Sequence, residues 1–600
     1  MKAILKYRIQ KTVPNVILLI LLPALTLVCT ECYTHVPWDL SVPIFFLNLL
    51  FYYLLFWICT FLFGSTGAGY AVAPLLPMLF GLINYFVVDF RSSPVVPWDL
   101  YSLNTAMSVA GNYEYEITAR VVFVTLGFLA ISLAGSRTGI RIKPAGRRLV
   151  CLLAMIAGMG IYVKGLGMET VIDAAGLDTT LFTPKVLYRN NGLAVGFLGN
   201  LKYMKVEKPQ GYSPQTAAEI AEEYPAESEA GGVDFPNVIV IMNEAFSDLS
   251  VFGEFETDYD YMPFIRSLEE NTVKGNLYVS VKGGNTANTE YEFLTGDTMA
   301  FLPAGSVPYQ QFIKGDMSSM ASCLKELGYQ TTAIHPYNAS GWARDKVYPW
   351  LGFDTTLFKS DFEDPLLIRN YISDYSAFSK IIELYEAKDA KTPMFVFEVT
   401  MQNHGGYSKD VEGFEETVHL TELTRKTTSV RAAEKYLTLM LETDRAFEML
   451  FNYFQDQEED TVILMFGDHQ PSDYITNTIL RLLDLDRETS EDVYFDNYIV
   501  PFVMWANFEI EEEQVEAISP NYLGGLLFEK ADIPLTGYQK FLQKLRADIP
   551  ALTANMLMTA EKERYRYEEA PAAATDLLND YRILDYNHLA DRNHCLEKFF

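Results

Sequence analysis

The stretch TVILMFGDH, Thr461–His469, combines the two features that decide the fold of this chain. Its first six residues are apolar or β-branched, and such a short continuous run is typical of a strand buried on both faces. The run stops at Gly467, and the next two side chains, Asp468 and His469, are of types that bind metal ions. We therefore expect a buried strand whose carboxyl end carries chemically active side chains.

Four further apolar runs have the same form. They are NVIVIM (237–242), TTAI (331–334), MFVFEVT (394–400) and IVPFVMW (499–505), and helical patterns such as Ser318–Leu327 and Arg431–Phe454 separate them. This alternation predicts an α/β domain around a mostly parallel central sheet. In such a sheet the carboxyl ends of the strands share one edge, where binding residues gather.

Unusual polar residues follow these runs directly. Glu244 comes after the run at 237–242, His335 after 331–334, and His404 after 394–400. A structural role is the more common explanation for any one such histidine, but three of the seven histidines in the chain follow predicted strands. Oxygen and imidazole ligands suit Mn²⁺, Zn²⁺ or Mg²⁺ and argue against a thiolate site.

A polar loop, GGNTANTEYEFLTG (Gly283–Gly296), contains threonines but no histidine, cysteine or lysine to activate them. A divalent ion removes this difficulty, because a hydroxyl bound to a metal has a lowered pKa and needs no adjacent base. The glycines would let the backbone approach such an ion closely. Alone, a glycine-rich loop is weak evidence, since most are simple turns.

The first quarter of the chain contains five apolar stretches, each close to the ~20 residues that span a bilayer core. A single stretch could be a buried globular helix, but five in succession indicate five transmembrane helices. They are Val13–Cys29, Val42–Phe63, Tyr70–Phe90, Ile117–Gly135 and Leu149–Gly167.

Basic residues predict the orientation of these helices, because Lys and Arg are retained in the cytoplasm. They cluster before the first stretch, at Lys2–Lys11, and between the fourth and fifth, at Arg137–Arg148. We therefore expect a multi-pass protein of the cell membrane with a cytoplasmic N-terminus. With five spans, the α/β domain would be extracytoplasmic.

Charge and cysteine content narrow the possible partners. The net charge is −30, and the acidic excess lies after the apolar stretches, which argues against a nucleic-acid partner. The six cysteines are scattered and suggest no disulfide framework. The expected organisation is a transmembrane domain at 1–167, a linker at 168–235, a catalytic domain at 236–560, and a C-terminal segment at 561–600 that packs on it or is disordered.

Taken in order after the apolar stretches, five motifs resemble those of the lipoteichoic acid synthase family, within the sulfatase and alkaline phosphatase superfamily. They are NVIVIMNEAFSD, GGNTANTEYE, HPYNASGWARD, TMQNHGGY and GDHQP. The resemblance implies a sulfatase-like fold, with Thr286 as nucleophile and metal ligand. It further implies that Glu244, Asp468 and His469 complete a Mn²⁺ site and that a phosphoglycerol pocket is lined by His335, Trp342, Arg344 and His404.

The chain departs from the family pattern at three positions near these residues. Ala245 and Asn285 stand where the family usually has a serine or threonine and a lysine, and Gly406 stands where a proline is common. A sulfatase proper needs Cys or Ser in a C/S-x-P-x-R context, which we do not find. Hydrolysis of sulfate esters is therefore disfavoured.

The function implied by the resemblance is phosphoglycerol transfer in lipoteichoic acid synthesis. Phosphatidylglycerol would be the lipid donor, and a glycolipid or a growing polyglycerolphosphate chain the acceptor, through a phosphothreonine-type intermediate. One alternative keeps the site but transfers phosphoethanolamine or phosphoglycerol to another cell-envelope glycan. The other is a catalytically degenerate, membrane-anchored binding protein, which the complete Glu, Thr, Asp and His set argues against.

Overall fold

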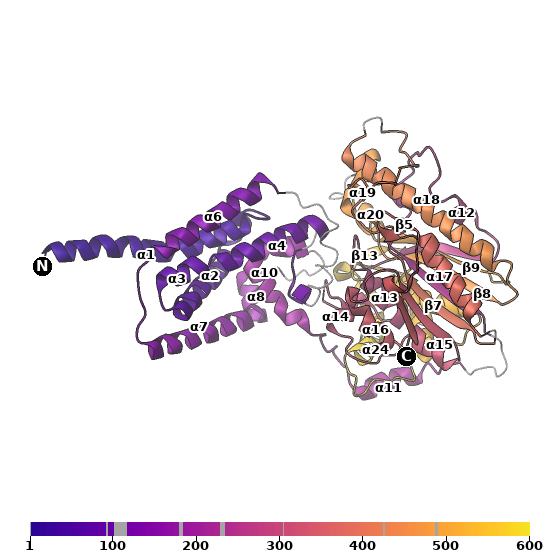
Figure 1. The fold of residues 1–600 in the computed structure, drawn as a ribbon. Helices are drawn as coiled ribbons and strands as arrows, with labels where there is room; N and C mark the ends of the chain where they lie inside the picture. The colour runs from indigo at the N-terminus through magenta and orange to yellow at the C-terminus, as the bar shows by residue number, and fades with distance from the viewer. Residues whose placement is uncertain are drawn as a thin grey trace. The chain divides into compact units, whose positions relative to one another are not determined.

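The structure is a computed structural model of the chain, and it describes residues 2–91, 94–100, 117–178, 184–227, 235–303, 305–389, 391–423, 426–485 and 490–600. The chain divides into two compact units (Figure 1). Among the described residues, unit 1 comprises those from 2 to 100 and from 117 to 205, and unit 2 comprises those from 206 to 600.

Unit 1 is built from helices. They are α1 (Lys2–Glu31), α2 (Val42–Phe63), α3 (Thr66–Val72), α4 (Leu75–Arg91), α6 (Ala119–Ser136), α7 (Ala145–Leu166), α8 (Glu169–Ala175), α9 (Pro184–Asn191) and α10 (Leu193–Gly199).

Four helical stretches among the described residues are long and apolar enough to cross a membrane, with mean hydropathy from 1.8 to 2.1. They are Val42–Phe63, Thr66–Val88, Ala119–Ser136 and Ala145–Leu166. The expected count of five is therefore corrected to four. The first expected span is helical and lies within α1, but its apolar part, Asn15–Glu31, is shorter than the other four.

Unit 2 is organised around an eight-stranded sheet with the order β10-β2-β9-β8-β1-β7-β3-β4. Five neighbouring strands, from β8 to β4, run parallel, and β9 pairs antiparallel with both β8 and β2. Their bounds are β1 Asn237–Asn243, β2 Thr272–Tyr278, β3 Gln330–His335, β4 Thr355–Phe358, β7 Met394–Val399, β8 Thr461–Gly467, β9 Ile499–Ala506 and β10 Glu513–Ile518.

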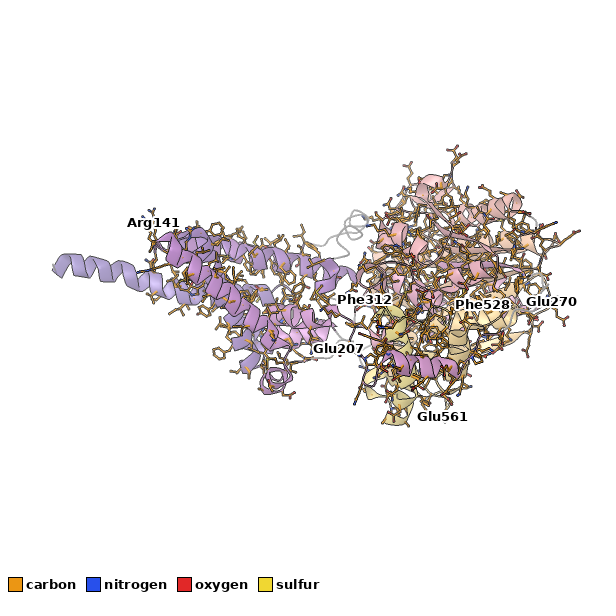
Figure 2. The ribbon with its side chains drawn as sticks, turned by 90° about the horizontal axis from the view of Figure 1, so that it is seen from below. Arg141, Glu207, Glu270, Phe312, Phe528 and Glu561 are labelled. Atoms are coloured by element: carbon orange, nitrogen blue, oxygen red, sulfur yellow. The ribbon has the colours of Figure 1, made fainter. Side chains whose placement is uncertain are left out.

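Helices cover both faces of this sheet (Figure 1). One face packs against α11 (Pro214–Glu222), α13 (Thr286–Thr295), α15 (Met320–Glu326), α16 (Arg344–Trp350), α21 (Pro520–Lys530), α22 (Gly537–Asp548) and α24 (Asn579–Leu589). The other packs against α12 (Pro263–Ser267), α17 (Asp374–Ala387), α18 (Thr428–Phe454) and α19 (Asp473–Leu482). Figure 2 shows the buried Phe528 of α21 within the unit and the exposed Glu270 and Glu561 at its periphery.

Shorter elements complete unit 2. Single helical turns or short helices are α14 (Pro308–Gln311), α20 (Glu491–Asp496) and α23 (Ala572–Leu577). A two-stranded hairpin consists of β5 (Leu367–Ile368) and β6 (Tyr371–Ile372), and a three-stranded sheet of β11 (Ala551–Leu552), β12 (Met556–Met558) and β13 (Arg564–Arg566).

The mostly parallel α/β sheet is confirmed, and all five expected runs are strands of it. The sequence interpretation did not identify β2, β4 and β10. These strands contain polar residues, as in EQVEAI of β10, because they lie at or near the edges of the sheet, where one side can meet solvent.

The expected linker at 168–235 is largely helical among its described residues. It contains α8, α9 and α10 in unit 1 and α11 in unit 2. The buried Ala217 and Ile220 of α11 join the core of unit 2, so this part is not a free linker. The segment 561–600 also packs into that core, through residues of α24 such as Tyr581 and Leu584.

The register of the parallel strands fixes where the functional side chains emerge. Asn243 at the end of β1 pairs with Gly467 at the end of β8, and Met242 of β1 pairs with Val399 of β7. His335 ends β3, the next strand along. The residues that follow these four strands therefore share one edge of the sheet.

Candidate active site

Glu244, Asp468 and His469 meet at this edge and are all buried. One ligand atom from each lies within 4.8 Å of the others. His469 Nε2 is 3.2 Å from Asp468 Oδ2 and 3.9 Å from Glu244 Oε1. Among the described residues this is the one cluster of three or more acidic, histidine or cysteine side chains with metal-binding spacing.

Hydrogen bonds from the backbone orient two of these side chains toward a common point. Asp468 Oδ1 accepts from the Ala245 N–H at 2.7 Å, while Oδ2 has no hydrogen-bond partner. His469 Nδ1 lies 2.9 Å from the Gln470 carbonyl oxygen, and Nε2 has no hydrogen-bond partner. The carbonyl fixes the proton on Nδ1 and leaves the Nε2 lone pair available, as in histidines that ligate metals.

These residues fit a divalent ion. Buried polar atoms without partners are rare, and here an oxygen and a nitrogen of that kind face the same place. Burial and the neighbouring Asp468 raise the pKa of Glu244 well above its ordinary value. Two carboxylates this close repel each other unless a cation lies between them. The oxygen and imidazole set suits Mn²⁺, Zn²⁺ or Mg²⁺.

The turn after β8 depends on Gly467. A Cβ atom at this position would lie 2.0 Å from the Phe246 carbonyl oxygen, so no larger residue fits without moving backbone. The opposing turn after β1 has Ala245 at φ 50°, a left-handed conformation that is uncommon for alanine. Close approach of the two turns therefore brings Glu244 and Asp468 together.

Thr286 is the first residue of α13, and its side chain lies beside Glu244, whose pKa it lowers against the larger effect of burial. The preceding Asn285 is left-handed, with φ 64°, and this sharp turn places the threonine at the helix start. A helix N-terminus carries partial positive charge and unpaired N–H groups that attract phosphate. Thr286 thus combines a hydroxyl, an acidic neighbour and an anion-attracting backbone.

Arg344 is almost completely buried, with 2% exposure, and is already paired within the chain. Its Nε lies 3.1 and 3.2 Å from the two carboxylate oxygens of Glu290, and its Nη2 also donates to Glu290. Its Nη1 is 3.0 Å from His335 Nε2, and Tyr348 donates to Glu290 at 2.9 Å. Glu290 therefore neutralises the guanidinium.

His335 lies between this ion pair and the sheet. Its Nδ1 is 2.9 Å from the Val399 carbonyl oxygen. Burial and the adjacent Arg344 hold its pKa well below the ordinary value, so the ring is neutral at physiological pH. The two residues before Arg344, Trp342 and Ala343, are both left-handed at φ 54° and 59°, and Trp342 is half-buried. This conformation directs the chain into α16.

His404 approaches the metal ligands from the loop after β7. Burial, together with the nearby His469 and Arg369, lowers the pKa of His404 to about 4. Its Nδ1 lies 3.2 Å from the Tyr371 hydroxyl, and its backbone carbonyl accepts from Arg369 at 3.2 Å. His404 is thus a neutral imidazole held beside the cluster.

The structure adds residues that the sequence interpretation missed. Thr289 Oγ1 donates to the Asp468 carbonyl oxygen at 2.8 Å and ties α13 to the metal-binding turn. Thr289 and Glu290 stand three and four residues after Thr286, a helical spacing that could have drawn attention to them. No sequence signal marks Arg369 or Tyr371, because a hairpin far from the motifs brings them to His404.

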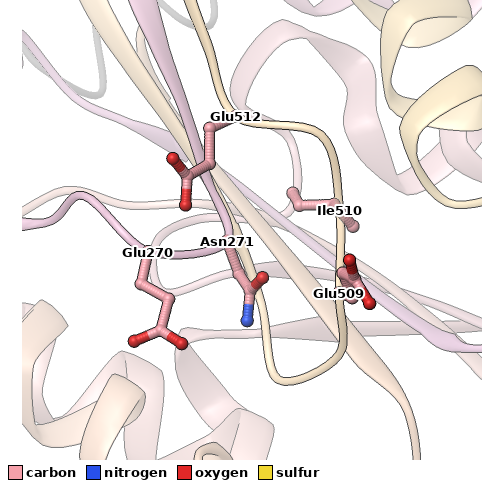
Figure 3. A pocket seen from close by; sticks show the side chains of 5 residues that line it. All are labelled: Glu270, Asn271, Glu509, Ile510 and Glu512. Carbon is pink, nitrogen blue, oxygen red and sulfur yellow. The ribbon is translucent and has the colours of Figure 1, made fainter.

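A separate cavity lies away from this site. It has a volume of about 480 Å³ and is lined by Glu270, Asn271, Glu509, Ile510 and Glu512 (Figure 3). Asn271 precedes β2 and Ile510 follows β9, so the cavity lies at the amino end of the parallel strands. The cluster lies at the opposite, carboxyl edge. An open acidic depression of this kind offers no cation or nucleophile for phosphate chemistry.

The paired state of Arg344 has a measurable consequence. Arg344→Ala should lower the melting temperature of unit 2, because it leaves the Glu290 charge buried without a partner, a change that costs about 3–5 kcal/mol. Arg344→Met combined with Glu290→Gln should recover much of this loss. Thermal unfolding of the full chain checks both variants. An Arg344→Ala protein of unchanged melting temperature and reduced turnover would instead support the predicted contact with substrate.

The chain is similar in sequence to known proteins. A putative cyclic beta-1,2-glucan modification protein of Rhizobium meliloti (strain 1021) is 31% identical over 431 residues, which are 69% of this chain and 64% of that protein. Lipoteichoic acid synthase 1 of Bacillus subtilis (strain 168) is 24% identical over 283 residues, which are 46% of this chain and 42% of that protein. The chain thus spans less than two thirds of the length of either relative.

Among solved structures, the phosphoglycerol transferase GacH of Streptococcus pyogenes, in complex with sn-glycerol-1-phosphate, matches with a TM-score of 0.53 and 20% identity. The match covers 66% of this chain and 99% of that one, and it shows a shared fold. Residues 236–530 match the family described as Sulfatase. The chain therefore carries a sulfatase-family domain at residues 236–530, preceded by four candidate membrane helices.

Proposed function

We propose that the chain is a membrane-anchored phosphotransferase that moves the phosphoglycerol group of phosphatidylglycerol to an acceptor hydroxyl. The observation that carries this proposal is the position of Thr286, at the start of α13, beside Glu244 of the buried Glu244, Asp468 and His469 cluster. A hydroxyl beside a divalent-cation site is the arrangement needed for attack on phosphorus.

Glu244, Asp468 and His469, with Thr286, would hold the ion. When bound, the ion supplies positive charge that lowers the pKa of the Thr286 hydroxyl and offsets the two carboxylates. We propose Mn²⁺ as this ion, with Mg²⁺ and Zn²⁺ fitting the same ligands.

Transfer would proceed in two displacements. The Thr286 oxygen attacks phosphorus, its O–P bond forms as the bond to the diacylglycerol oxygen breaks, and that oxygen takes up a proton. The acceptor hydroxyl then attacks the phosphoglycerol-threonine, loses its proton and restores the threonine. The N–H groups at the start of α13 stabilise charge on the transferring group. His335, Trp342, Arg344 and His404 remain the predicted lining of the pocket, with Arg344 acting through its contacts with Glu290 and His335.

Two kinds of acceptor would react in the same way at this site, because each would attack the phosphoglycerol-threonine through a hydroxyl group. The resemblance to lipoteichoic acid synthases favours a glycolipid or a growing polyglycerolphosphate chain. The relative named as a cyclic beta-1,2-glucan modification protein, with 31% identity, favours a hydroxyl of a cell-envelope glucan. Both use one donor and one covalent step, so the donor reaction is the first to test.

Replacement of Thr286 tests the donor reaction. Thr286→Ala should abolish release of diacylglycerol from labelled phosphatidylglycerol, because no oxygen remains to attack phosphorus. Thr286→Ser keeps the hydroxyl and should retain part of the activity. Both changes are small, so the melting temperature should stay the same. Full diacylglycerol release by the alanine variant would disprove the covalent mechanism.

Replacement of the metal ligands tests the ion. Asp468→Ala and His469→Ala should each lose most of the bound metal together with turnover, and excess Mn²⁺ should partly restore both. His594→Ala is the matched control, since His594 is exposed and pairs with Asp591 at 2.9 Å, away from the cluster. Elemental analysis of the purified chain measures metal content. Full occupancy in either ligand variant would rule out the proposed set.

We further propose that unit 2 is extracytoplasmic, as the basic segment at Arg137–Arg148 indicates. The four spans place unit 2 on the side of the membrane opposite that segment, and they place the N-terminus on the same side as unit 2 unless α1 also crosses. A cysteine introduced on the exposed surface of unit 2, for example Glu561→Cys, should react with an impermeant reagent in intact cells. Protection there, with labelling of a cysteine in the Arg137–Arg148 segment, would reverse the orientation.

A further inference from the structure

Arg369 is a buried cation that no carboxylate of the described chain neutralises. It is 6% exposed, and its Nη1 and Nη2 donate to the carbonyl oxygens of His404 and Gly405 at 3.2 and 3.0 Å. Its Nε has no hydrogen-bond partner. Burial lowers its pKa, and tyrosine hydroxyls rather than acids oppose that change. A buried charge is costly without a counter-charge, and a bound anion would supply the one that the described carboxylates do not.

This guanidinium lies beside the candidate active site. It lowers the pKa of His404, as does His469. It also stands 4.9 Å from the ring centre of Tyr407, whose pKa is raised by burial and by Glu244 and Asp468. His404 and Tyr407 are therefore near both Arg369 and the cluster. An anion bound near the metal ligands is within electrostatic reach of Arg369.

Arg369 holds this position through an unusual turn. Ile368 pairs directly with Tyr371, so Arg369 and Asn370 form the two-residue connection of the β5–β6 hairpin. Both are left-handed, at φ 53° and 71°. Such turns favour Asn and Gly, whereas an arginine there is rare. From this turn the Arg369 side chain reaches the loop after β7, where it donates to the carbonyl oxygens of His404 and Gly405.

The other side of the same segment is apolar and exposed. Leu366, Leu367 and Tyr375 are 56%, 53% and 52% exposed. Leu366 accepts from the Ser373 N–H and donates to Ser376 Oγ, both at 2.9 Å, which brings the leucines next to the start of α17. Within the described part of unit 2, six large apolar or tyrosine side chains are at least 44% exposed, and the three most exposed of them lie in the ten residues from Leu366 to Tyr375.

We propose that the segment Leu366–Tyr375, here called the donor hairpin, takes up the lipid donor. Its inner side presents the Arg369 cation to the phosphate, and its outer side presents Leu366, Leu367 and Tyr375 to the acyl chains. The match is to an amphiphile that is anionic at one end and apolar at the other. The inference rests on the proposed function, because it names the element that binds that donor.

Charge around the donor hairpin selects a single lipid rather than a charged surface. Asp361, Glu363 and Asp364 precede it in the chain. These acids oppose adsorption to an anionic bilayer. The apolar side chains bind acyl chains without needing electrostatic attraction to the bilayer surface. Apolar contact with the acyl chains therefore supplies the binding, and Arg369 supplies the contact with phosphate.

The apolar contact is tested with two substrates of the full-length chain. One is phosphatidylglycerol in phosphatidylcholine vesicles that contain the protein, and the other is a water-soluble diester of glycerol phosphate and nitrophenol, which has no acyl chains. Leu366→Ser with Leu367→Ser should lower kcat/KM for the lipid by about tenfold, as less apolar area is buried. Release of nitrophenol should be unchanged. Leu577→Ser, with 46% exposure in α23, is the matched control and should change neither rate.

The phosphate contact is tested in the same assay. Arg369→Gln should lower kcat/KM for both substrates, since both contain the phosphodiester, with metal content and melting temperature unchanged. Arg369→Lys should recover part of the loss, because it restores the charge without the planar guanidinium. Arg564→Gln is the control, as Arg564 has its own carboxylate partners in Asp492 and Asp496.

The outcomes separate the two proposals. Equal lipid turnover by wild type and the double leucine variant overturns the donor hairpin while the proposed function stands. Loss of both rates in Arg369→Gln without recovery by lysine, together with a lower melting temperature, shows that Arg369 only holds the 404–405 loop and also overturns it. A wild-type chain that cleaves the soluble diester but not the lipid overturns the proposed donor, and the hairpin assignment with it.

Discussion

Glu244 and Asp468 place two carboxylates side by side in the interior of unit 2, where little solvent screens their repulsion. The sheet forces this proximity, because β1 and β8 are paired in register up to Asn243 and Gly467 and the chain turns sharply after each. His469 adds an imidazole whose Nε2 faces the same point. A cation relieves the repulsion, so the architecture of the parallel sheet and the chemistry of the site are two consequences of one strand pairing.

Backbone conformations around the cluster show how strongly the fold determines it. Ala245, Asn285, Trp342 and Ala343 are all left-handed, and each is adjacent to Glu244, Thr286 or Arg344 or one residue removed. Such conformations cost about 1–3 kcal/mol each and persist where surrounding packing allows no alternative. Ala245 and Asn285 are also two of the positions at which this chain departs from the family it resembles. The Ala245 N–H donates to Asp468 Oδ1. This hydrogen bond comes from the backbone, so it does not depend on which side chain stands at position 245.

The sequence predicts the centre of the sheet better than its edges and the metal cluster better than the pocket. Continuous apolar runs identify β1, β3, β7, β8 and β9, because a strand buried on both faces tolerates few polar residues. Asp468 and His469 follow from β8 by position. The pairing of Arg344 with Glu290 and the place of Arg369 depend on which side chains tertiary packing brings together. The β5–β6 hairpin is short and has no periodic pattern, so its sequence does not predict these contacts.

The charges of the site balance when an anionic substrate is bound. Glu290 opposes Arg344, and a divalent ion would oppose Glu244 and Asp468, which leaves Arg369 as the cation without a carboxylate. A phosphodiester carries one negative charge and completes this balance. At long range, however, the chain has a net charge of −30 and repels an anionic lipid, although salt screens that repulsion beyond ~8–10 Å. Attraction by the site therefore acts only at contact. A domain tethered to the membrane meets its donor at high effective concentration, and the apolar helices of unit 1 are suited to provide that tether.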